Sequence, residues 1–67
     1  MGIEAKEIPT IEIAVFMGDR RVLETLKYIG WKVKEADSHL ALIVGNPELY
    51  HTLEITEGIL AVKIVRF

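Results

Sequence analysis

The chain has 67 residues, a length that allows a single domain over residues 1–67 and leaves that domain with a small core. It contains no cysteine, which excludes disulfides and thiolate metal sites and fits a cytoplasmic location. Its net charge of −2 disfavours nucleic acid as the main partner, and no apolar run approaches the ~20 residues needed to span a bilayer.

The apolar content of 51% is high for so short a chain. A small core cannot bury all of this surface, so we expect some of it to contact another molecule, and a second copy of the chain is the simplest candidate. Glutamine is absent and Asn46 is the single asparagine, a bias that is typical of thermophilic proteins.

The first third of the chain is predicted to form a strand and a helix. After a polar lead-in over residues 1–7, residues 8–17 alternate in polarity and are rich in β-branched side chains, which indicates a strand. Asp19 is a good N-cap for a helix over residues 20–29, whose apolar residues share one face. Gly30 is a typical residue to end that helix.

Four elements follow. Residues 31–35 alternate apolar side chains with lysines, as in an edge strand, and residues 39–45 are nearly all apolar, as in a buried central strand. An Asn-Pro pair then predicts a short second helix that ends near residues 54–57. Residues 59–67 form the last predicted strand.

The predicted order is therefore β-α-β-β-α-β. The gap between the second and third strands is only about four residues, too short for a parallel crossover, so these strands must form an antiparallel hairpin. This order predicts an α+β, ferredoxin-like βαββαβ fold: a four-stranded antiparallel sheet with two helices on one face and the first and third strands in the centre. A small open parallel α/β sheet is the alternative, which the short gap disfavours.

The sheet face away from the helices is predicted to be substantially apolar. Along the third strand, this interpretation places Ala41 and Ile43 on the open face and the other apolar residues under the helices. We expect a homodimer to bury this face or the edge of the fourth strand. Single-stranded nucleic-acid binding on the same face, with phenylalanines stacking among lysines, is the alternative. The predicted interface comprises Phe16, Ile43, Ala61, Val65 and Phe67.

Residues with catalytic potential do not form a recognisable site. Asp37-Ser38-His39 contains the side-chain types of a hydrolase triad, but contiguous side chains cannot form one, so we interpret these residues as a turn. His39 and His51 do not have the spacing of a metal motif. We therefore expect no enzymatic activity, no metal and no cofactor.

A weak anion site is predicted where the first strand runs into the first helix. Free N–H groups after Gly18, together with Arg20 and Arg21, could hold a phosphate or a carboxylate, and we expect Asn46 to lie near this loop. Asp19 supplies an anion of its own there, so a small anionic ligand is a secondary hypothesis.

The βαββαβ order, Gly18 before the first helix and Gly58-Ile59 at the start of the last strand resemble ACT and related regulatory domains that sense small molecules. In such domains the ligand sites usually form at domain interfaces, which implies a dimer. The sequence as a whole predicts a non-enzymatic, homodimeric binding or assembly module.

Overall fold

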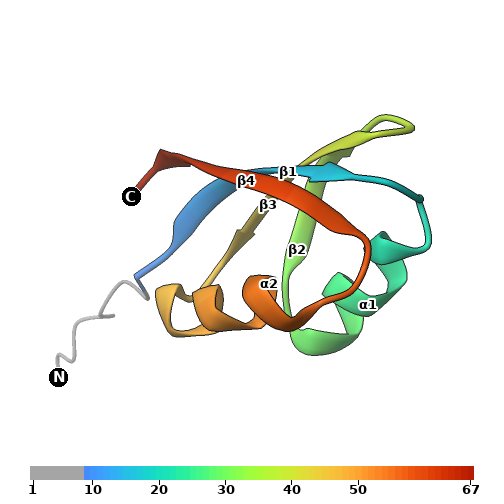
Figure 1. The fold of residues 1–67 in the computed structure, drawn as a ribbon. Coiled ribbons are helices and arrows are strands. Elements are labelled where there is room, and N and C mark those ends of the chain that lie inside the picture. Colours follow the sequence, from blue (N-terminus) through green and yellow to red (C-terminus); the bar gives the residue numbers. More distant parts are fainter. Residues whose placement is uncertain (1–8) are drawn as a thin grey trace, which may run out of the picture.

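The computed structural model describes residues 9–67 and contains the predicted succession of strands and helices (Figure 1). The predicted lead-in over residues 1–7, and residue 8 of the first predicted strand, lie outside the described residues. The short 3-10 helix η1 leads directly into α2. The elements are β1 (Ile11–Met17), α1 (Val22–Ile29), β2 (Lys32–Ala36), β3 (Leu40–Gly45), η1 (Pro47–His51), α2 (Thr52–Ile55) and β4 (Ile59–Arg66).

The four strands form one sheet in the order β2-β3-β1-β4, and every neighbouring pair is antiparallel. Figure 1 shows both helices on the same side of this sheet. The short connection between β2 and β3 forms the predicted hairpin, in which the Asp37 amide donates to the Leu40 carbonyl. The structure thus confirms the α+β, ferredoxin-like βαββαβ arrangement with β1 and β3 in the centre and β2 and β4 at the edges.

The helix α1 begins two residues later than predicted because a turn precedes it. The Asp19 carboxylate accepts from the Arg21 amide at 2.8 Å, and the Asp19 carbonyl accepts from the Val22 amide at 3.2 Å. Asp19 therefore satisfies a free N–H group, as an N-cap does, but in the turn before the helix. At the other end, Gly30 has a φ of 132°, which favours glycine over residues with a side chain.

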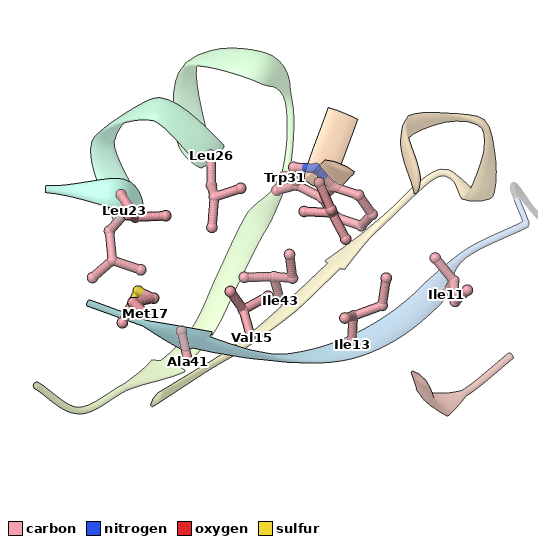
Figure 2. Packing of buried hydrophobic residues seen from close by; sticks show 11 residues of the cluster. Ile11, Ile13, Val15, Met17, Leu23, Leu26, Trp31, Ala41 and Ile43 are labelled. Carbon is pink, nitrogen blue, oxygen red and sulfur yellow. The ribbon is translucent and has the colours of Figure 1, made fainter. Parts of the chain in front are cut away.

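The core lies between the sheet and the two helices, and Trp31 joins its parts (Figure 2). The indole lies so close to Gly45 on β3 that a Cβ atom at that position would be 2.5 Å from the ring. The indole Nε1 donates to the Thr52 hydroxyl at 3.1 Å, and that hydroxyl donates to the Leu49 carbonyl. One side chain between α1 and β2 thereby fixes both the end of β3 and the start of α2.

The predicted faces of β3 are wrong. Ile43 and Ala41 lie opposite Ile13 and Val15 of β1, and all four point into the core (Figure 2). The alternate residues of the strand, which we expected under the helices, face the open side of the sheet instead. A strand that is apolar at nearly every position has no alternation from which its inward face can be read, so only the register with β1 decides it. The residues that change sides are Leu40, Leu42 and Val44.

The strand β4 is also more exposed than expected. Two register shifts interrupt its pairing with β1, and they leave Leu60 and Val65 without a partner opposite them. Such bulges bend a strand and turn side chains away from the regular alternation. Val62 packs against the core, whereas Leu60 is 73% exposed.

Candidate interaction surfaces

The open face of the sheet carries an apolar patch over its two central strands. Phe16 lies opposite Leu40 on one side and Ala61 on the other, and the two larger side chains are 43% and 40% exposed. One step along the strands, Ala14 lies opposite Leu42, and both are half-buried. No helix in residues 9–67 covers this face (Figure 1). The apolar patch consists of Ala14, Phe16, Leu40, Leu42, Val44 and Ala61.

Cations surround the patch on both sides. Lys34 on β2 reaches across the sheet to Glu12 on β1, with 3.6 Å between Nζ and Oε2. Lys63 lies opposite Ala14 of the patch, and Glu35 lies opposite Leu42. The strands of this face therefore carry four cations and two carboxylates, with Asp37 as a third carboxylate in the hairpin opposite Leu40, although the chain as a whole has a net charge of −2. The basic rim consists of Lys32, Lys34, Lys63 and Arg66.

The second exposed apolar surface is the β4 edge. This strand has eight residues, and among the described residues no other strand pairs with the side of β4 that faces away from β1. Lys63 and Arg66 are its charged residues. Leu60, Val65 and the following Phe67 are exposed, the last by 86%. Exposed apolar edges of this length are places where strands of other chains can add.

The five predicted interface residues do not form one surface. Phe16 and Ala61 are paired neighbours on the open face, and Val65 and Phe67 lie at the far end of the β4 edge. Ile43 is 0% exposed and belongs to the core, so its inclusion was an error that follows from the wrong faces of β3. Gly45, two residues further on, leaves room for the Trp31 indole, a contact between β3 and a residue that precedes β2 and that only the folded chain reveals.

The predicted anion loop is occupied by its own ion pair. Arg21 Nε and one terminal guanidinium nitrogen lie 3.2 and 3.1 Å from the same oxygen of Asp19. Hydrogen bonds from the Arg21 backbone amide and then from its side chain lower the pKa of Asp19, and the same pair raises the pKa of Arg21. Gly18 and Arg20 are exposed beside this pair. Arg21 is therefore engaged within the loop.

Asn46 does not lie near that loop. The antiparallel register places Gly45 opposite Ile11, at the start of β1, whereas Gly18 follows the end of β1. Gly18 lies seven residues beyond Ile11 along the strand, which corresponds to about 23 Å. The Asn46 side chain instead accepts from the Glu48 amide at 2.9 Å and caps η1. The four predicted ligand-binding residues, Gly18, Arg20, Arg21 and Asn46, are thus not brought together.

A shallow groove runs between α1 and α2. Its lining includes Thr25 and Ile29 from α1 and Thr52, Ile55 and Thr56 from α2 and the residue after it. The hydroxyls of Thr52 and Thr56 donate to backbone carbonyls within their own turn at 2.6 and 2.7 Å. Two of the three threonine hydroxyls that line the groove are therefore already bonded to the backbone.

The residues considered for chemistry have structural contacts. Asp37 accepts from the Ser38 amide, and a ring nitrogen of His39 lies 3.2 Å from the Met17 carbonyl, so this segment is the turn of the β2–β3 hairpin. Over residues 9–67, no three side chains of the metal-ligating types come together. In the same residues, no helix has both the length and the apolar character needed to cross a membrane.

Comparison of the chain with family models, with curated proteins and with solved structures finds no match in any of the three. The function is therefore argued from the two surfaces, the apolar patch with its basic rim and the β4 edge.

Proposed function

We propose that this chain is a non-catalytic assembly module that forms a homodimer by antiparallel pairing of its β4 edge with the β4 edge of a second copy. The observation that carries the proposal is the β4 edge itself, which has eight residues, two charges and four exposed large apolar side chains on or just beyond it. A two-fold axis uses the same surface on both copies, so a single adhesive edge is sufficient.

Pairing would satisfy backbone groups and bury side chains together. The outer N–H and C=O groups of β4 would exchange water for partners across about 25 Å of strand. Leu60 and Val65, which the register shifts leave unpaired with β1, would gain neighbours from the other copy. Burial of apolar surface supplies most of the favourable free energy in such an association.

The charge pattern of β4 selects a register for this dimer. If the two-fold axis passed between two residues, each residue would lie opposite its own neighbour in the other copy, and neighbouring side chains point to different faces of the sheet. Residues that lie opposite each other in a sheet must share a face, so the axis must pass through a residue. Val62 and Lys63 are the central residues of the strand, and an axis at Lys63 would place two ammonium groups opposite each other, which is destabilising. An axis at Val62 remains, and it sets Leu60 of one copy opposite Ile64 of the other.

The test is the mass of the chain in solution, measured by light scattering after size exclusion. We expect the wild-type chain to be a dimer and Leu60→Asp to be a monomer at the same concentration, because the substitution places a carboxylate in the paired edge. Ile55→Asp is the matched control, since Ile55 is an aliphatic residue of similar exposure, 76% against 73%, on α2. We expect this control to remain a dimer.

Two outcomes contradict the proposal. A monomeric wild-type chain at high concentration would exclude the dimer itself. A dimer that survives Leu60→Asp but is lost with Leu42→Asp, on the open face, would move the interface from the edge to the apolar patch. We further propose a cytoplasmic location, which the absence of cysteine supports.

A further inference from the structure

We infer that the open face of the sheet is a second docking surface, which adjoins the β4 edge, and that its partner is an acidic, apolar segment of another protein. This inference does not depend on the proposed dimer, because the large apolar side chains of the patch lie on β1 and β3 in the middle of the sheet, and β4 contributes to this face only Ala61, Lys63 and Arg66.

Charge is distributed unevenly over the two sides of the molecule. The basic rim places four cations around the patch, and the Lys34–Glu12 pair neutralises one of them. The other three cations face the carboxylate of Glu35 and that of Asp37, which lies opposite Leu40 in the hairpin. In contrast, the segment 46–58, on the helix side, has three glutamates and no lysine or arginine. An excess of positive charge on one face of an acidic chain is complementary to an acidic partner.

The open face also has an apolar end and a charged end. Phe16 and Leu40 lie together near the β2–β3 hairpin, whereas Glu12 and its neighbour Arg66 lie four residues back along β1. This offset corresponds to about 13 Å along the strands. A matching segment would carry its apolar anchors and its carboxylates at this separation, about four residues apart if extended or nine if helical.

The composition of the patch favours a protein over a nucleic acid. Sequence-tolerant binding of single strands relies on several aromatic rings that stack with bases, and Phe16 is the one aromatic residue of the patch. The remaining members of the patch are aliphatic side chains, which offer no ring for a base to stack on. A second copy of this face is also a poor partner, because the two basic rims would meet.

The test uses three labelled probes in fluorescence anisotropy. The first is a synthetic helical peptide with leucines along one side and flanking glutamates. The second is its counterpart with lysines in place of the glutamates, and the third is a single-stranded oligonucleotide of mixed sequence. We expect the acidic peptide to bind at least about tenfold more tightly than the lysine peptide, with an affinity that falls as salt is added. We expect it also to bind more tightly than the oligonucleotide.

A pair of charge-matched variants locates the binding. Lys32→Glu with Lys34→Glu reverses two cations on β2, far from the β4 edge, and should remove the preference for the acidic peptide. Arg20→Glu with Lys27→Glu makes the same change in charge on the helix side, where both residues are exposed, and should leave the preference intact. If the first pair does not fold, as judged by circular dichroism, Lys32→Glu alone replaces it.

Three results would overturn the inference: equal binding of the two peptides or of neither, tighter binding of the oligonucleotide, or equal effects of the two variant pairs. Because the mass of each variant is measured separately, failure here and failure of the proposed dimer are distinguishable.

Discussion

At one edge of the sheet, β2 spans five residues, three of them charged, and a register shift between Val33 and Glu35 interrupts its pairing with β3. At the other edge, β4 spans eight residues and carries two charges. Short length, lysines and bulges are the features with which proteins prevent strands from adding to an edge. β2 combines all three features, whereas β4 has two register shifts of its own but is longer and has fewer charges. Length and charge therefore favour β4 over β2 as the edge to which another strand adds.

The two edge strands also differ in the side chains that attach them to the core. Trp31 immediately precedes β2 and is buried against Gly45 and Thr52. On β4, Ile59 and Val62 pack against the core and are half-buried. The β2 edge is therefore anchored by one large buried side chain that precedes it, whereas the β4 edge is attached by smaller aliphatic side chains within the strand.

Removing the anchor of β2 should have the largest effect. We expect Trp31→Ala to lower the free energy of unfolding by about 3–5 kcal/mol, since it deletes a buried indole. Trp31→Phe keeps a ring but loses the hydrogen bond to Thr52, and we expect a cost of about 1 kcal/mol from that bond. Chemical denaturation at a fixed protein concentration measures both. Tyr28→Ala, on the exposed side of α1, is the control, with an expected change below about 0.5 kcal/mol. A similar cost for Tyr28 and Trp31 would contradict the anchoring role.

Removing the charged side chains of β2 should make this strand a second edge at which another copy can pair. We expect Lys32→Val, Lys34→Val and Glu35→Val together to shift the mass in solution from dimer to larger assemblies, because both edges of each copy can then pair. The matched control removes the same charges from the helix side, as Arg20→Val, Glu24→Val and Lys27→Val. Larger assemblies in both variants would assign the effect to lost charge in general rather than to the edge.

The register of the proposed dimer can be tested by cross-linking, since the chain has no cysteine of its own. An axis at Val62 places the two Val62 Cα atoms about 4.5–5.5 Å apart, within the range for a disulfide. We expect Val62→Cys to give a cross-linked dimer on oxidation. Leu60→Cys is more exposed, but the two copies would hold it about 13 Å apart, so we expect little cross-linking. Efficient cross-linking through residue 60 instead would exclude this register.

The smallest expected effect leaves both edges unchanged and concerns the turn before α1. Because hydrogen bonds from Arg21 lower the pKa of Asp19, the charged carboxylate stabilises the folded state at pH values above its usual pKa of 3.8. That contribution is lost as the pH falls through the lowered pKa. We therefore expect wild type to melt at a slightly higher temperature than Asp19→Asn at neutral pH, with the difference vanishing in strong acid. A difference that is constant with pH would exclude the charge as its cause.

The fold could be predicted because local signals and connection lengths agree. The alternation in β1, the lysines of β2 and the short gap before β3 together leave one arrangement, and the structure has it. The inward face of β3 could not be predicted, because a strand with apolar residues at nearly every position fits the core in either orientation. The bulges of β4 likewise depend on its pairing with β1 and leave no mark in the sequence.

The apolar character of the open face could be predicted from the sequence, but only some of its residues could be identified. An apolar open face was expected, and Phe16 and Ala61 do lie on it, but the wrong face of β3 placed Ile43 there in place of Leu40 and Leu42. The anion loop was expected to include Asn46, and the antiparallel direction of β1 and β3 separates them. Both errors concern long-range geometry, which a list of local signals does not contain.

Trp31 is the single tryptophan of the chain. Because the indole is buried and bonded to Thr52, its fluorescence should be blue-shifted in the native state and should move to the red when water reaches the ring. This emission reports on the junction of β2, β3 and α2, whereas the mass in solution would report on the proposed pairing of β4. Measured together, the two signals would distinguish loosening of the core from dissociation of the proposed dimer.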